Sequence, residues 1–309
     1  MEIASVSDLG AGVTCLDAHY VKPGVACFYL LEEAREFAVI ETGNAHSVPL
    51  LMQHLEQRGV TAEQVRYVIP THVHLDHAGG AGAMMARFPE AELLVHPRGA
   101  RHMADPGKLI DSAKMVYGEE AFTALYGDIM PIAVERIREI EDGEELDLNG
   151  RPLVFRHTRG HANHHMCIWD ARSQGWFTGD MFGVSYPWFQ FAAGDFILPS
   201  TTPTQFAPED YLQSLDLLAS YQPQRMFLTH FGERAYTEQG ARLLRDQVLR
   251  YCELGREFAP NAEALQAALS DYAVSLLSEM AIDVPEETLR EWVSLDAPLN
   301  TQGLLHWLS

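Results

Sequence analysis

The chain has 309 residues, of which 47% are hydrophobic, and 43 acidic residues against 22 lysines and arginines give it a formal net charge of −21. So negative a chain repels phosphate backbones, and since no basic patch stands out, we expect no nucleic-acid partner. The longest apolar runs have strand length, so we expect no transmembrane helix and no membrane partner. The N-terminus lacks a signal-peptide pattern and the four cysteines form no CxxC motif, which favours a cytoplasmic protein.

Strands and helices alternate over the first three quarters of the chain. We first expect a strand pair (25–31, 36–42), a helix (47–59), a buried strand (65–72), a short helix (79–88) and a strand (91–96). Residues 97–138 are mostly helical, and they are followed by two hairpins (142–158, 165–180), a long ordered loop (181–207), a helix (208–221) and a strand (225–230). This alternation indicates an α/β sandwich rather than an all-α or all-β fold.

The last quarter of the chain has a helical pattern only. From about residue 236 the apolar residues recur with the 3.6-residue period of helices, which divides the chain into a sandwich at 1–235 and a helical extension at 236–309. The extension carries many apolar groups near its end, among them Trp292, Leu304, Leu305 and Trp307. They must be buried, and the alternatives are packing on the sandwich, covering a site entrance, or forming a homodimer face.

The stretch "THVHLDHAGG" at 71–80 crowds three histidines and an aspartate directly after a predicted strand. His72 and His74 point to the same side of an extended segment, and Asp76 and His77 follow across the turn. One alternative is that these are surface residues, with Asp76 capping the next helix. Against it, three more strand ends present a ligand-type side chain, namely His161, Asp180 and His230. Imidazoles with carboxylates suit zinc, iron or manganese better than calcium.

Four motifs together resemble those of the metallo-β-lactamase superfamily: "HVHLDH", "GH" at 160–161, "TGD" at 178–180 and "TH" at 229–230. The resemblance covers approximately residues 12–235. It implies a four-layer αββα sandwich, to which the helical extension is appended. It also implies that His72, His74 and His161 bind a first metal ion, that Asp76, His77 and His230 bind a second, and that Asp180 bridges both.

The resemblance implies hydrolytic chemistry at two divalent ions, most simply zinc, with iron or manganese as alternatives. Two such ions about 3.5–4 Å apart can share a hydroxide that attacks a carbonyl or phosphorus. Asp76 and Asp180 are the carboxylates we expect to take part in catalysis. No GxSxG motif offers a competing nucleophile. We therefore expect a hydrolase of an ester, thioester, lactone or similar bond in a small, partly apolar substrate.

Several positions distinguish branches of the superfamily. The B1 and B2 lactamases have a cysteine where Asp180 stands, and flavodiiron proteins have a glutamate where His74 stands, so the chain matches neither. The stretch "RGHANHH" resembles the glyoxalase II stretch GHTxGH, with His161 and His165 in register. Ala162 and His164 replace its threonine and second glycine, and the residues that hold glutathione are not identifiable.

Other residues are candidates for supporting the ligands or lining a pocket. Glu41 stands where the family usually has aspartate, and it either supports the site from behind or lies at an exposed strand end. His165 is likewise a supporting residue or a structural histidine. The threonines beside the ligands, such as Thr71 and Thr229, are expected to bond to the backbone. Tyr186, Trp188 and Phe189 are either substrate contacts or ordinary core residues, and an aromatic wall would favour an apolar or planar substrate.

Two other classes of function compete with a hydrolase. A regulatory or ligand-binding protein of this fold would keep a site with vestigial activity, and its partner would contact the helical extension. A phosphodiesterase or nuclease is the weaker alternative, because the charge of −21 opposes binding of RNA.

Overall fold

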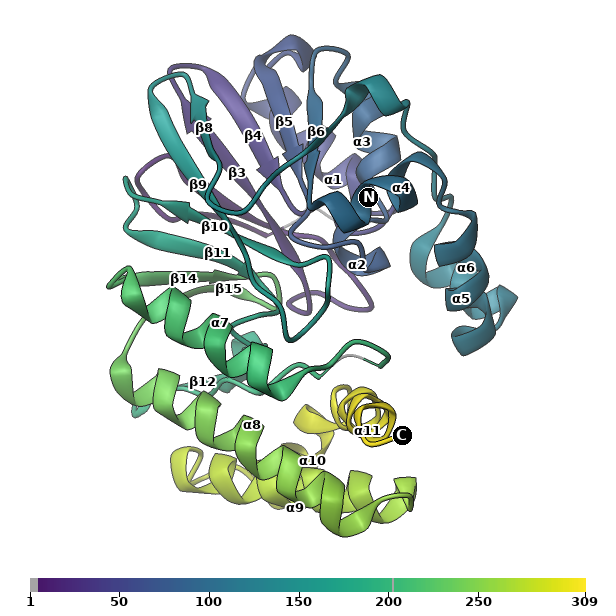
Figure 1. The fold of residues 1–309 in the computed structure, drawn as a ribbon. Coiled ribbons are helices and arrows are strands. Elements are labelled where there is room, and N and C mark those ends of the chain that lie inside the picture. Colours follow the sequence, from purple (N-terminus) through teal and green to yellow (C-terminus); the bar gives the residue numbers. More distant parts are fainter. Residues whose placement is uncertain (1–4, 202) are drawn as a thin grey trace.

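The computed structural model describes residues 5–201 and 203–309, and two sheets packed face to face form its centre (Figure 1). The first sheet has seven strands in chain order, β1 (Val6–Asp8), β2 (Val13–Asp17), β3 (Cys27–Glu33), β4 (Glu36–Ile40), β5 (Val65–Ile69), β6 (Glu92–Val95) and β7 (Ile137–Glu139). The second has the order β15-β14-β11-β10-β9-β8, with β8 (Glu145–Leu148), β9 (Arg151–His157), β10 (Met166–Asp170), β11 (Gly175–Gly179), β14 (Arg225–Leu228) and β15 (Gly232–Ala235).

Helices cover the outer face of each sheet (Figure 1). The first sheet packs against α1 (Val48–Gln57), α3 (Ala81–Arg87) and α4 (Pro97–Ala104), and the second against α7 (Pro208–Ser220) and α8 (Glu238–Phe258). A short α2 (Leu75–Ala78) precedes α3, and α5 (Gly107–Tyr117) and α6 (Glu119–Tyr126) follow α4. The prediction of an αββα sandwich is confirmed.

Alternation along the strands explains why these sheets are buried on both faces. In β3, Tyr29 and Leu31 enter the core between the sheets, whereas Phe28 and Leu30 pack towards the helices. All four are at most 1% exposed. A strand buried on both faces is an almost continuous apolar run, which is why the sequence identifies it easily.

Six strands of the described residues were not expected from the sequence, four of them in the two large sheets. β1 is exposed along its length and β7 has only three residues, so neither shows the apolar alternation on which strand prediction depends. β15 is a four-residue edge strand directly after a strand that was predicted, and β2 follows the glycine-rich turn that joins it to β1. The expected loop at 181–207 is largely confirmed except at residue 202, which lies outside the described residues, but it contains a small hairpin of β12 (Gln190–Phe191) and β13 (Gly194–Asp195).

The last residues form α8 and three further helices, α9 (Ala262–Met280), α10 (Glu286–Val293) and α11 (Ala297–Trp307). α9 and α10 pack on the segment that follows Asp180, with Leu277 and Leu289 in the same apolar cluster as Phe196. Leu304 is fully buried in the same chain. Division into units at 1–235 and 236–309 stays a prediction, as does a homodimer. Within the described residues, no helix has the length and apolar character needed to cross a membrane.

Candidate metal centre

The structure brings all seven predicted ligands together at one edge of the sandwich. His72 follows β5, and His74 is the N-cap of α2, which itself contains Asp76 and His77. The other three ligands, His161, Asp180 and His230, follow β9, β11 and β14. β11 and β14 are parallel neighbours, so their carboxyl ends meet at the same edge, where α/β sheets place their sites.

Their ligand atoms form three overlapping groups, each within 4.8 Å: His72 with His74 and His161, His72 with His77 and Asp180, and Asp76 with His77 and His230. Asp180 connects the groups. Its Oδ1 lies 3.2 Å from His77 Nε2 and 3.6 Å from His230 Nε2, and its Oδ2 lies 3.4 Å from His161 Nε2. One carboxylate therefore faces members of both predicted ligand sets.

The donor set fits divalent metal ions. Among the described residues, the buried atoms His77 Nε2 and Asp180 Oδ1 make no hydrogen bond, although they face each other. Buried polar atoms are rarely left unpaired in a folded protein. Two such atoms in a cluster of imidazoles and carboxylates are what metal coordination would satisfy.

The two predicted ligand sets differ in their electrostatics. Burial, together with the neighbouring histidines, lowers the pKa of His72 and holds the pKa of His74 at about 3, so both are neutral and have a lone pair available. Burial opposes charge at His230 too, but Asp180 and Asp76 outweigh it and raise its pKa to about 9. The same carboxylates with Glu41 raise the pKa of His77. Metal binding would therefore release protons on the side of His77 and His230.

Glu41 supports this cluster from behind and is 1% exposed, so it does not lie at an exposed strand end. Its Oε1 accepts hydrogen bonds from His77 Nδ1 at 3.0 Å, Thr71 Oγ1 at 2.5 Å and Thr229 Oγ1 at 2.9 Å. The expectation that these threonine hydroxyls bond to the backbone is wrong. Thr71 and Thr229 directly precede the predicted ligands His72 and His230, so their bonds to Glu41 tie it to both ligand segments.

Three further residues hold ligands in place, and sequence reasoning singled out only the first of them. His165 is fully buried, and its Nε2 accepts a hydrogen bond from the Asp180 amide at 3.3 Å. Ser200 Oγ donates to Asp180 Oδ2 at 3.2 Å, and the Ser200 carbonyl lies 3.1 Å from His161 Nδ1. His164 Nδ1 accepts from the Val73 amide at 3.4 Å. His164 stands within the quoted "RGHANHH", whereas no motif marks Ser200.

The three pocket candidates lie in different surroundings. Tyr186 is 2% exposed, and its hydroxyl donates to Asp296 Oδ1 at 3.0 Å. Trp188 stacks on Tyr186 with ring centroids 4.8 Å apart, and the Lys22 ammonium lies 4.5 Å from the centroid of the Trp188 ring. Phe189 is fully buried in the cluster that includes Phe196, which is the packing expected of a core residue.

A pH effect is expected at His96, whose Nδ1 accepts the Arg98 amide at 3.0 Å and so caps α4. Burial, with His157 and two arginines nearby, lowers its pKa to about 4. The unfolded chain, with a histidine pKa of about 6.5, then binds more protons between these values. The resulting stability is complete above about pH 6.5 and is lost as the pH falls towards 4. His96→Asn keeps a side-chain acceptor for the Arg98 amide. In this variant the free energy of unfolding, measured with urea on metal-free protein, should depend less on pH between 4 and 6.5. An unchanged pH dependence would contradict this role of His96.

Comparison with known proteins agrees with this geometry. The model of the metallo-beta-lactamase superfamily matches residues 22–230. A metallo-beta-lactamase fold-containing protein, ST1585 of Sulfurisphaera tokodaii, is 25% identical over 214 residues, 68% of this chain and 74% of that protein. Its crystal structure superposes with a TM-score of 0.66 at 22% identity, covering 95% of this chain and 98% of that one. TTHA1429 of Thermus thermophilus gives a TM-score of 0.68 at 21% identity, covering 97% and 94%.

Two relatives have names that state an activity. The human acyl-coenzyme A thioesterase MBLAC2 is 26% identical over 184 residues, 56% of this chain. The atrochrysone carboxyl ACP thioesterase of Aspergillus chevalieri is 26% identical over 155 residues, 49% of this chain. The matched regions span only 64% and 38% of those two proteins. Since the family model extends over more than half of the sequence and includes every predicted ligand, the chain belongs to the metallo-beta-lactamase superfamily.

Proposed function

We propose that this protein is a metal-dependent hydrolase of thioesters. The observation that carries the proposal is the position of Asp180, whose two oxygens face both groups of histidines. The thioesterase names of two relatives support the choice of bond. Divalent ions at these groups would lower the pKa of water and polarise the thioester carbonyl.

The protein's own residues would have separate tasks. The histidines would hold the ions, with Glu41 fixing His77 and His165 fixing the Asp180 backbone. Asp76 is the most exposed carboxylate of the cluster, with a side chain 21% exposed against 8% for Asp180. It therefore faces the open side, where it could orient the attacking water.

A basic surface on α4 and the start of α5 would suit an anionic thioester carrier. Arg98 and Arg101 are exposed on α4, three residues apart and so on one face, and Lys108 is exposed at the start of α5. Among the described residues, no carboxylate lies within ion-pair distance of these three side chains. α4 packs closely on the ligand segment, since a Cβ at Gly99 would lie 2.8 Å from Val73.

Charge reversal on this surface should affect only substrates that carry negative charge. Arg98→Glu with Arg101→Glu should raise KM about tenfold for an acyl-coenzyme A, equivalent to about 1.4 kcal/mol, because attraction becomes repulsion. KM for an uncharged acyl-N-acetylcysteamine should be unchanged. The matched control is Arg242→Glu with Arg250→Glu on α8, which should leave both values unchanged. Equal effects of the α4 variant on both substrates would remove this surface from substrate binding.

The proposal as a whole is tested with metal-stripped and reconstituted protein. Acyl-coenzyme A thioesters, lactones, oxygen esters and phosphodiesters are compared at equal concentration, with release of free thiol or acid as the readout. Turnover of thioesters that depends on added zinc, iron or manganese is expected. Turnover that survives complete removal of metal, or that is confined to phosphodiesters, contradicts the proposal.

A further inference from the structure

Two buried polar side chains lie at the start of α11, Asp296 at its N-cap and Asn300 in its first turns. They are four residues apart, which places them above each other on a helix. Asp296 is 9% exposed and Asn300 3%. We propose that these two are positioning residues through which the C-terminal extension sets the geometry of the metal centre. This inference rests on the proposed function in that it takes the centre to bind metal.

Asn300 holds the segment that supports two ligands. Its Nδ2 donates to the Pro199 carbonyl at 3.1 Å, and its Oδ1 accepts from the Thr201 amide at 2.7 Å and from Thr201 Oγ1 at 2.9 Å. Ser200 lies between these two anchored residues. It contacts Asp180 and His161, as described above. The amide of Asn300 is thus one residue removed from two predicted ligands.

Asp296 reaches a third ligand by another route. It accepts the hydrogen bond of Tyr186, whose neighbour Ser185 accepts from the Phe231 amide at 3.1 Å and donates its own amide to the His230 carbonyl. His230 is held further by its Nδ1, which donates to the Val25 carbonyl at 2.8 Å. A displacement of α11 would therefore be transmitted to His230 as well as to Asp180 and His161.

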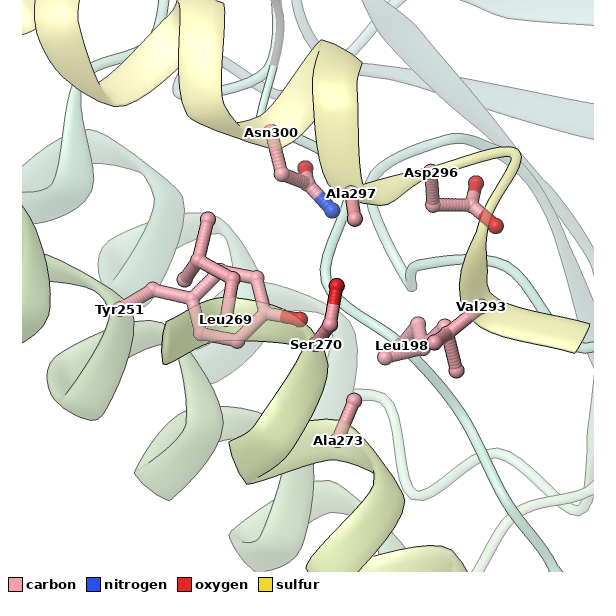
Figure 2. Close-up of a pocket in the computed structure, with 9 residues that line it drawn as sticks. All are labelled: Leu198, Tyr251, Leu269, Ser270, Ala273, Val293, Asp296, Ala297 and Asn300. Atoms are coloured by element: carbon pink, nitrogen blue, oxygen red, sulfur yellow. The ribbon is translucent and has the colours of Figure 1, made fainter. Parts of the chain in front are cut away.

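The chemistry of the α11 contact favours positioning over simple packing. A cavity of about 10 Å³ lies beside this contact, and its lining includes Tyr251, Ser270, Asp296 and Asn300. Figure 2 shows how these side chains lie around it. That volume is roughly the space of one water molecule. Buried polar groups add directional constraint at a cost in desolvation, whereas the rest of α11 packs through apolar residues such as Leu304. A helix that only covered the sandwich would need no such groups here.

The test compares variants of one helix. Asn300→Ala should lower the affinity for zinc, measured by competition with a chromophoric chelator, by roughly 10–100-fold, as expected when a residue that orients ligands is lost. It should also change the visible absorption of cobalt-loaded protein, which reports ligand geometry. Leu304→Ala is the control: it removes a fully buried apolar side chain of the same helix and should lower the melting temperature, but it leaves the hydrogen bonds of Asn300 to Pro199 and Thr201 in place. Its zinc affinity and cobalt spectrum should match the wild type.

Ser200→Ala and Asp296→Ala give a second measurement in case Asn300→Ala does not fold. Both should weaken zinc binding and alter the cobalt spectrum. Asp296→Asn, which keeps an acceptor for Tyr186, should restore both towards the wild-type values. The inference is overturned if the folded variants bind zinc as the wild type does, or if Leu304→Ala weakens binding as much as they do. If the wild type binds no metal, the proposed function fails instead, so the two failures are distinguishable.

Discussion

Asp180→Ala should reduce thioester turnover by about 10³-fold or more, equivalent to a loss of about 4 kcal/mol of transition-state stabilisation. The reason is that, among the residues the structure describes, Asp180 alone has a carboxylate that faces His77, His161 and His230 together. Its removal should also lower the amount of metal retained per chain. Steady-state kinetics and elemental analysis of the same preparation measure both effects.

The control for this variant is Asp216→Ala, because that carboxylate lies on α7 with 67% of its side chain exposed and pairs with Arg245, away from the predicted ligands. It should retain full turnover and full metal content. Circular dichroism must show that Asp180→Ala keeps its fold. Wild-type turnover in a folded Asp180→Ala protein would contradict the assignment of Asp180.

Gly160→Ala should destabilise the protein by more than about 4 kcal/mol, which is exceptional for a single substitution. Gly160 has φ +122°, and a Cβ there would lie 2.3 Å from the Cα of Tyr211 at the start of α7. Backbone atoms cannot give way as a flexible side chain can, so either α7 or the segment of His161 must move. Equilibrium unfolding in urea, with and without zinc, measures the loss.

Gly194→Ala is the matched control, since Gly194 has φ +127° but no atom lies within 4 Å of its added Cβ. Gly194→Ala should therefore lose only the stability that the strained backbone conformation costs, on the order of 1–3 kcal/mol. If the two variants lose equal stability, the close approach of α7 is not what requires a glycine before His161.

The ligands could be predicted from the sequence because their positions follow from local patterns. Apolar runs mark β5, β11 and β14, and the parallel pairing of β11 with β14 brings the residues after them to one edge. The support by Glu41 could be anticipated too, because it also follows a buried strand. Its partners Thr71 and Thr229 could not, because a hydroxyl beside a ligand has the same local sequence whether it bonds to the backbone or to a carboxylate.

The contacts of Ser200, Asp296 and Asn300 could not be predicted from the sequence, for a different reason. Asn300 and Thr201 are 99 residues apart, and Tyr186 and Asp296 are 110 apart. Neither pair belongs to a motif or to a periodic face shared with a ligand. Such contacts arise only when α11 is placed on the segment after Asp180, and the apolar pattern of the extension predicts that it is buried without saying where.

Metal content is the measurement that tests the central claim most directly. The protein is purified without added metal, stripped with a chelator and equilibrated with zinc, iron or manganese. After dialysis, its metal content is measured by elemental mass spectrometry. Two divalent ions per chain are expected, with thioester turnover rising as they bind. Retention of no metal, or full turnover by the stripped protein, would contradict a hydrolytic metal centre built from these seven residues.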